Sequence, residues 1–425
     1  MAEGRRQTAS RAVAPAGRPA GLVPRLGTLL PYMGPAFVAS IAYVDPGNFA
    51  TNIAAGSLFG YDLLWVVLAA NLVAILVQSL AARLGIATGQ TLPELSRRFL
   101  PARLNRFLWV VAELGTMATD LAELMGAALG LRLLFHLPLL AAALLAGAST
   151  LLLLKLEERG FRLVEEVIIG FLGVIAVAYV GEVFLARPAW GTLLPHLVVP
   201  RLDGEELLYA AGIFGATVMP HVVYLHSALV LPRRTGADPA VLDRYERIDV
   251  LVAMNVAFLV NASLLVMAAA AFGARGLEVS GIEEAHRTLR PLFGPAAATV
   301  FAVGLLASGL ASSMVGTMAG QTILAGFVDV RMGLLERRLL TLLPAVAVVA
   351  LGFDPVRVLV LSQVVLSFAL PFALGPLVFF NADRRVMGER SAPPWLTGLA
   401  TLVALAVVAL DLLLLAQAAA GLLRR

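Results

Sequence analysis

The stretch that decides the fold is Tyr43-Val44-Asp45-Pro46-Gly47-Asn48-Phe49, which interrupts the first long apolar run of the chain. A carboxylate such as that of Asp45 costs about 2.5 to 3.5 kcal/mol at the centre of a membrane helix, so we expect a functional reason for it. Pro46 has no N–H for the helix ladder and Gly47 tolerates non-helical angles, so the helix should break here. The break leaves backbone carbonyls such as that of Ala42 unpaired beside a carboxylate and an amide. These groups form a set of oxygen ligands at membrane depth.

The composition is that of a polytopic helical membrane protein. The 425-residue chain is 60% hydrophobic and 14% charged, with a mean hydropathy of +0.87, which is far more apolar than a soluble domain. It contains no cysteine, which excludes disulfides, Cys-zinc sites and Cys-ligated iron–sulfur clusters and leaves O, N or thioether S ligands for any metal. The net charge of +4 comes from short segments between apolar runs, which favours membrane topology over nucleic-acid binding.

Eleven apolar runs are expected to form membrane helices. They cover approximately residues 28–58, 62–84, 106–134, 137–155, 161–186, 205–231, 249–274, 295–326, 338–353, 356–380 and 394–422. With a cytoplasmic N-terminus, the inside segments hold 23 of the 32 Lys and Arg residues. The positive-inside rule therefore predicts the N-terminus in the cytoplasm and the C-terminus outside, in the cell inner (plasma) membrane. Residues 1–27 are expected to be a disordered cytoplasmic arm.

The sixth run repeats the interruption of the first, in Gly215-Ala216-Thr217-Val218-Met219-Pro220-His221. The two runs occupy corresponding positions if the first ten helices form two five-helix halves, 28–186 and 205–380. Because five is odd, the second half must then be inverted in the membrane relative to the first. Paired interrupted helices at corresponding positions indicate the midplane binding site of a transporter. We therefore expect an all-α fold with an inverted repeat of five plus five helices and an additional eleventh helix, 394–422.

The two breaks together offer ligands suited to a transition metal. Asp45 and Asn48 provide hard oxygens, the freed carbonyls of Ala42 and Ala216 provide two more, and Met219 provides a soft sulfur. Hard oxygens alone suit Mg²⁺ and Ca²⁺, whereas a thioether shifts the preference toward Mn²⁺, Fe²⁺ and Co²⁺. An isolated methionine in a membrane helix more often only packs. The position of this one, directly before a proline and opposite the other broken helix, favours the ligand interpretation.

The third run carries acidic residues on one face. At about 100° per residue, Glu113 and Asp120 nearly align, and Glu123 flanks them. Intramembrane carboxylates usually face a bundle interior or a water-filled path, so a proton path is favoured over structural hydrogen bonding for Asp120 and Glu123. Glu113 is nearer the start of the run, where contact with water is a sufficient explanation. His221 lies two residues from Met219 on another helix face, so protonation is its preferred role.

Four further polar residues lie in or beside apolar runs. Arg337 and Arg338 open the ninth run and either snorkel to the interface or pair with the acids of the third run. Gln363, in the tenth run, either gives an amide oxygen to an ion or supports polar helix packing. His226 is about 140° round the helix from His221, so these two histidines do not form a helical metal-ligand pair.

The two interrupted runs resemble the signature motifs of the Nramp family of divalent metal transporters, in particular its bacterial proton-coupled manganese importers. Asp45-Pro46-Gly47-Asn48 and Met219-Pro220-His221 carry the resemblance. It extends from about Leu30 to Leu415 and includes Ala118-Thr119-Asp120-Leu121-Ala122-Glu123 and Leu361-Ser362-Gln363. The resemblance implies the LeuT-like inverted-repeat fold.

The resemblance also implies roles for individual residues. Position by position, it implies metal ligation by Asp45, Asn48, Met219 and the carbonyls of Ala42 and Ala216, joined in some conformations by Gln363. It implies that proton movement is served by Asp120, Glu123, His221, Arg337 and Arg338. The methionine site is altered in the distant relatives that move magnesium or aluminium, so its presence here favours transition metals.

We therefore expect a secondary active transporter, not an enzyme, that imports Mn²⁺, Fe²⁺ and similar ions with protons by alternating access. The metal is the cargo, so no cofactor is expected, and the partners are metal ions, protons and the lipid bilayer, without nucleic acid or an obligate protein. The alternative is a Na⁺-coupled amino-acid transporter of the same fold, although Asp45 would repel the substrate carboxylate. The sequence contains no His-Glu-x-x-His motif, which argues against an intramembrane metalloenzyme. Proton-coupled accumulation of the ion above equilibrium would exclude a simple channel.

Overall fold

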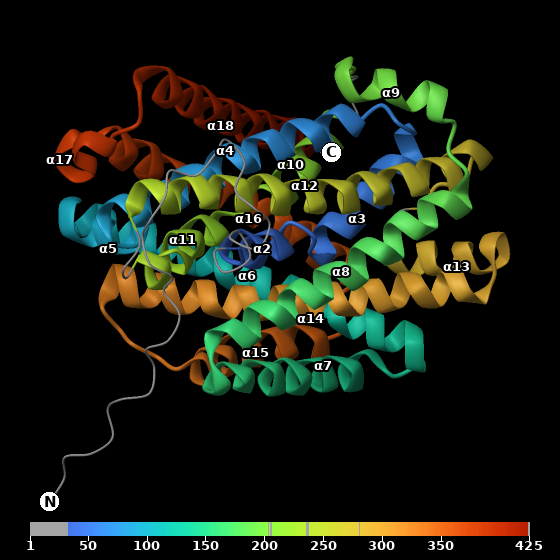
Figure 1. Ribbon diagram of the computed structural model, residues 1–425. Coiled ribbons are helices and arrows are strands. Elements are labelled where there is room, and N and C mark those ends of the chain that lie inside the picture. The colour runs from blue at the N-terminus through green and yellow to red at the C-terminus, as the bar shows by residue number, and fades with distance from the viewer. Residues whose placement is uncertain (1–32, 203, 205, 235–237, 280, 424–425) are drawn as a thin grey trace, which may run out of the picture.

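The structure is a bundle of helices without a β-strand in its described part (Figure 1). The computed structural model describes residues 33–423 except 203, 205, 235–237 and 280. The expected N-terminal arm, 1–27, and the first residues of the first apolar run lie outside the described residues.

Each of the eleven expected runs corresponds to a helix or to a pair of helices in the described part of the chain. The first and sixth runs are pairs, namely α2 (Pro35–Ala42) with α3 (Pro46–Phe59) and α10 (Glu206–Thr217) with α11 (Pro220–Leu229). The uninterrupted runs are α4 (Leu64–Thr88), α6 (Ala102–Phe135), α7 (Leu139–Leu154), α8 (Phe161–Ala186), α12 (Pro239–Ala271), α14 (Pro295–Val328), α15 (Leu334–Ala350), α16 (Pro355–Ala382) and α18 (Pro394–Leu423).

Four short helices in the connections were not expected from hydropathy. They are α5 (Leu92–Phe99), α9 (Trp190–Val198), α13 (Ile282–Phe293) and α17 (Arg384–Met387). In Figure 1, α9 and α13 lie toward one end of the bundle, and α5 and α17 lie toward the opposite end. This division matches the connections that the sequence assigns to opposite sides of the membrane.

Seven of the described helices are long and apolar enough to cross a membrane, when α10 and α11 are counted together as one. Counting α6 with α7, between which the chain bends by 115°, as one span makes eight. Two other expected spans fall outside this count because of their length: the first break leaves α2 and α3 with 8 and 14 residues, and α15 has 17. The first broken span is thus hidden from a search for uninterrupted apolar helices.

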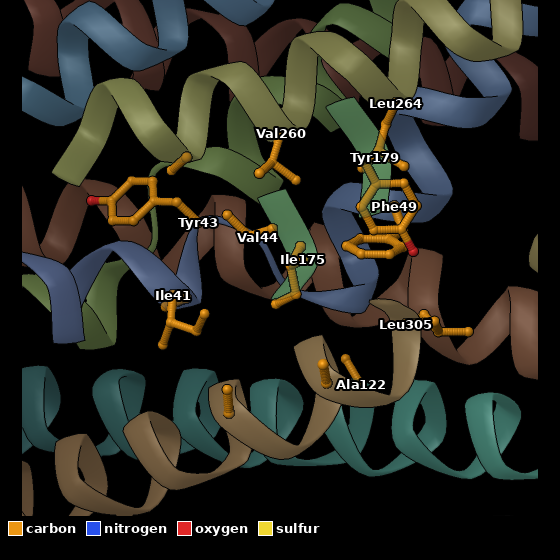
Figure 2. Close-up of a cluster of buried hydrophobic side chains, with 14 of the residues drawn as sticks. Ile41, Tyr43, Val44, Phe49, Ala122, Ile175, Tyr179, Val260, Leu264 and Leu305 are labelled. Carbon is orange, nitrogen blue, oxygen red and sulfur yellow. The ribbon is translucent and has the colours of Figure 1, made fainter. Parts of the chain in front are cut away.

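The first broken span lies between the long helices α12 and α14 (Figure 1). Figure 2 shows Val44 and Phe49, on either side of the break, among apolar side chains that include Ile175, Tyr179 and Val260. The rings of Phe49 and Tyr179 meet edge to face with their centroids 4.8 Å apart. The break therefore lies within the apolar core.

Helices α6 and α14 approach each other so closely that glycine is required at the contact. A Cβ atom on Gly309 would lie 2.5 Å from the backbone nitrogen of Ala127, and one on Gly130 would lie 2.8 Å from that of Leu306. Small residues allow such backbone contact between membrane helices. The contact brings the acidic face of α6 against α14.

Candidate metal site

The first break is organised by Asp45, which caps α3. Its backbone is extended, and its Oδ1 accepts hydrogen bonds from the backbone N–H of Asn48 at 2.8 Å and from Asn48 Nδ2 at 2.7 Å. Such a cap satisfies a free N–H and places negative charge at the positive end of the helix dipole. The side chain is fully buried. The sequence therefore folds locally so that one carboxylate is held at the N-terminal tip of a buried helix.

Each of the two prolines leaves the carbonyl four residues before it without a helical hydrogen-bond donor. In an α-helix the carbonyl of a residue accepts a hydrogen bond from the N–H four residues later. Pro46 follows Ala42 by four residues, and Pro220 follows Ala216 by four residues. Since proline has no N–H, both carbonyls lose their helical donor. The breaks thus produce one helix C-terminal carbonyl each.

The side chain of Asn48 joins the two breaks. Its Nδ2 donates to Asp45 Oδ1 and, at 2.8 Å, to the carbonyl oxygen of Ala216, while its Oδ1 accepts a hydrogen bond of 3.1 Å from Thr217 Oγ1. The Asp45 and Ala216 oxygens therefore lie within one hydrogen-bond length of the same nitrogen. Two predicted ligands that are separated by 171 positions converge on one point.

Met219 occupies in α11 the position that Asp45 occupies in α3. Both are N-cap residues with extended backbones, both are followed by proline at the first helical position, and both are fully buried. A thioether is a poor helix cap compared with Asp, Asn or Ser, and no side chain caps α11. Local helix chemistry therefore does not explain this methionine.

Gln363 reaches the first break from α16. A Cβ atom on Gly47 would lie 1.8 Å from Gln363 Nε2 and 3.0 Å from Asp45 Oδ2, so the amide and the carboxylate meet over a glycine. Only glycine leaves room for them there. All the side chains expected as ligands thus lie at or beside the two breaks.

Three side chains that the sequence analysis did not single out brace the first break. Asn261 Nδ2 of α12 donates to the carbonyl of Tyr43 at 2.7 Å, and Asn52 Nδ2 of α3 donates to Asn261 Oδ1 at 2.9 Å. Ser308 Oγ of α14 donates to the carbonyl of Val44 at 2.5 Å. These bonds satisfy the two carbonyls that follow Ala42. Asparagines inside apolar runs are the signal that would have found two of the three, because polar side chains of this kind form hydrogen bonds between membrane helices.

The acids of α6 pair with the two arginines of α15. Arg337 forms an ion pair with Glu113, and Arg338 Nη1 lies 2.8 Å from Asp120 Oδ1. Both arginine side chains are fully buried, so the pairing interpretation is correct and snorkelling to the interface is wrong. Glu113 is likewise not explained by water contact alone, because Arg337 neutralises it.

The remaining acid of α6, Glu123, is fully buried and has no ion-pair partner within the described ranges. A Cβ atom on Gly316 of α14 would lie 2.8 Å from Glu123 Oε2 and 3.1 Å from Asp120 Oδ1. One turn further along α6, a Cβ atom on Gly126 would lie 2.0 Å from Cγ of Pro46. The row of acids therefore begins beside the first break and continues along α6 toward Glu113.

The two histidines of α11 lie in different surroundings, as their angular offset predicts. His221 Nδ1 lies 3.3 Å from Thr119 Oγ1, next to the acidic face of α6. His226 Nδ1 lies 2.8 Å from Gln78 Oε1, and its Nε2 lies 2.9 Å from Glu246 Oε1. Across the described residues, no three His, Asp or Glu side chains form a cluster suited to a metal. Any ion at the breaks must therefore rely on carbonyls, amides, one carboxylate and the thioether.

A helical membrane bundle with two broken helices around a shared polar point defines a class, the LeuT-like transporters. A solved structure of Mhp1, a nucleobase-cation-symport-1 family transporter with bromovinylhydantoin bound, superposes with a TM-score of 0.61 at 17% identity, covering 83% of this chain and 79% of that one. This likeness concerns the fold alone. It confirms the predicted fold class of a LeuT-like inverted repeat.

The chain belongs to the Nramp family, described as natural resistance-associated macrophage protein-like, whose model matches residues 36–417. It is 49% identical over 394 residues to the divalent metal cation transporter MntH of Caldanaerobacter subterraneus subsp. tengcongensis, covering 92% of this chain and 94% of that protein. It is 33% identical to the Eremococcus coleocola manganese transporter, solved with an aromatic bis-isothiourea substituted compound, with a TM-score of 0.84 and coverage of 92% and 88%. These relatives are named as transporters and not as enzymes.

Proposed function

We propose that this protein imports divalent transition-metal ions such as Mn²⁺ and Fe²⁺ across the cell inner membrane, together with protons, by alternating access. The observation that carries the proposal is the convergence of Asp45 Oδ1 and the Ala216 carbonyl on Asn48, between two proline-broken helices. The names of its relatives, a divalent metal cation transporter and a manganese transporter, support the same substrate class.

The ion binds where the amide of Asn48 now joins the two oxygens. Asn48 turns its Oδ1 toward the cation and gives up its hydrogen bond from Thr217. The other ligands are Asp45, Met219, the carbonyls of Ala42 and Ala216, and the amide oxygen of Gln363. One carboxylate and one thioether among neutral oxygens suit a borderline transition metal better than Ca²⁺, which prefers several carboxylates.

A cavity that reaches the first broken helix gives the ion its access. It has a volume of about 610 Å³ and lies beside α3, α6, α13 and α16, and its lining includes Ala50, two residues beyond Asn48. Three carboxylates in this lining, those of Glu283, Glu284 and Asp354, outnumber its two arginines, Arg132 and Arg287. Carboxylates in a cleft raise the local cation concentration and the rate of capture. The α13 end of the bundle is therefore the outer one, with the N-terminus in the cytoplasm and the C-terminus outside.

The proton leaves along α6. Glu113 and Asp120 are paired with Arg337 and Arg338, and Glu123 is the one acid of the row that forms no ion pair in the described part of the chain. Burying a carboxylate as an anion without an ion-pair partner is costly, so we infer that Glu123 takes and releases the transported proton. His221, hydrogen-bonded to the same helix, passes the proton between the metal site and this row.

The mechanical units are two inverted five-helix halves, 28–186 and 205–380, with 394–422 as an additional helix. One group of helices rocks against the other around the ion, and the two interrupted helices are the elements that hinge. The alternative cargo, an amino acid with Na⁺, has only the fold in its favour. The N-terminus of α3, where a substrate carboxylate would bind, is already capped by Asp45.

Uptake of Mn²⁺ into proteoliposomes tests the proposal. Asp45→Ala removes the only carboxylate at the breaks, so we expect no uptake above empty vesicles. The matched control is Asp238→Ala, which removes the N-cap carboxylate of α12 from an exposed position and should transport like the wild type. Unchanged uptake by Asp45→Ala would refute the metal site. Metal uptake without acidification of the vesicle interior would refute proton coupling while leaving metal import intact.

A further inference from the structure

The eleventh apolar helix carries a buried carboxylate that the proposed function leaves without a role. Asp411 is the only charged residue in the sequence of α18, lies near the middle of the helix, and is 4% exposed. It falls within the apolar span Pro394–Leu413. A charged side chain inside a membrane span is expensive and is retained for a function by default.

Asp411 holds one residue of α16. Its Oδ1 accepts a hydrogen bond from Ser367 Oγ, which is also buried, and its Oδ2 has no hydrogen-bond partner among the described residues. Helix α18 packs against α16 and also contacts α10 and α4. The bond is therefore the polar point of an otherwise apolar helix contact.

Ser367 stands one helical turn from Gln363, on the same face of α16. Gln363 meets Asp45 over Gly47 at the first break. At the second break, a Cβ atom on Gly215 would lie 3.0 Å from Cβ of Ser367 and 3.7 Å from the carbonyl oxygen of Gln363. This single turn of α16 thus contacts both broken helices, and Asp411 of α18 accepts a hydrogen bond from its Ser367.

The same turn is a weak point of α16. Pro371 lies four residues after Ser367, so the carbonyl of Ser367 has no helical N–H donor. Helices bend at such positions. Without an external hold, the segment that carries Gln363 is free to tilt about this point and to move away from Asp45.

We propose that Asp411 is a positioning residue of the metal site, which through Ser367 fixes the turn of α16 that presents Gln363 and backs Gly215. This inference rests on the proposed function, because it assigns a role to Asp411 in the same site. It makes α18 a support of the ion site rather than an appended membrane anchor.

The test is the KM for Mn²⁺ of the full chain in proteoliposomes. Asp411→Ala should raise KM about tenfold, the low end of the effect of losing a residue that orients a metal ligand. Ser367→Ala should raise KM by the same factor, and combining Ser367→Ala with Asp411→Ala should raise KM no further. Asp411→Asn keeps an acceptor oxygen for Ser367 and should stay within about twofold of wild type. The matched control is Val407→Ala, one turn away on the buried face of α18, which loses packing without losing the bond.

The effect must also depend on Gln363. In a Gln363→Ala background, Asp411→Ala should leave KM unchanged. The proposal is overturned if Asp411→Ala behaves like Val407→Ala, or if its effect persists at full size without Gln363. If Asp411→Ala does not yield folded protein by size-exclusion chromatography, Ser367→Ala decides by the same criteria. Absence of metal uptake by the wild type would instead refute the proposed function itself.

Discussion

A single methyl group at Gly316 is predicted to disturb the row of acids without touching the metal site. In Gly316→Ala the new Cβ atom would lie 2.8 Å from Glu123 Oε2 and 3.1 Å from Asp120 Oδ1, closer than carbon and oxygen tolerate. Separating α6 from α14 to relieve the clash would open the close backbone contacts at Gly309 and Gly130, so a shift of the side chain costs less. Glu123 must therefore move.

Overpacking of this kind destabilises by about 1 to 3 kcal/mol, and the gain in helix propensity from glycine to alanine returns up to about 1 kcal/mol. We expect a net loss of about 1 to 2 kcal/mol, seen as a lower unfolding temperature in detergent. The matched control is Gly173→Ala in α8, where a Cβ atom meets nothing within 4 Å. It measures the propensity gain alone.

The transport assay separates the two functions of the site. Mn²⁺ uptake by Gly316→Ala without a pH gradient should stay within about twofold of wild type, because the ligands at the breaks are untouched. Its stimulation by an inward proton gradient should be lost, since Glu123 no longer sits where it receives the proton. The reasoning is refuted if Gly316→Ala matches Gly173→Ala in both unfolding temperature and gradient dependence.

Two further predictions follow from side chains at the site and at the α13 end of the bundle. Met219→Ala removes the proposed soft ligand, so the variant should still transport Mn²⁺. Ca²⁺ should compete with Mn²⁺ about tenfold better than in the wild type, which corresponds to roughly 1.4 kcal/mol. Competition curves identical to those of the wild type would show that Met219 only packs. Burial, reinforced by the nearby charges of Arg290 and His136, lowers the pKa of His286 from its usual 6.5. The unfolded chain therefore binds this proton more readily than the folded one, and stability falls as the pH drops through the unfolded value. The fall in unfolding temperature between about pH 7 and pH 5 should be shallower in His286→Gln than in wild type, and parallel curves would contradict the assignment.

The breaks could be predicted from the sequence because their cause is local. A proline removes the donor of the carbonyl four residues earlier, so Ala42 and Ala216 are found by counting along the chain. The orientation of the Asn48 amide could not be predicted, because its partners Ala216 and Thr217 are 168 and 169 residues away. Which broken helix faces which is decided by packing, and no short segment encodes it.

The partners of the charged residues illustrate the same limit. The sequence shows acids on one face of α6 and two arginines at the start of α15, yet leaves snorkelling and pairing open. The pairing of Arg337 with Glu113 joins residues 224 positions apart, and it needs Gly320, where a Cβ atom would lie 2.5 Å from Arg337 Nε. The short helices were missed for a different reason. Helix α5, for example, is defined by the capping box of Thr91 and Glu94 rather than by apolar length.

The two breaks supply equivalent backbone groups and unequal side chains, and we propose that this difference makes the metal site selective. At each break a helix C-terminus contributes a carbonyl, from Ala42 or Ala216, and the N-cap position of the next helix contributes a side chain, from Asp45 or Met219. The carboxylate caps its helix and holds the charge that attracts any divalent cation. The thioether leaves its helix uncapped, so the positive end of α11 opposes cations in general. Only an ion that gains from sulfur offsets that opposition, which favours Mn²⁺ and Fe²⁺ over the harder Mg²⁺ and Ca²⁺.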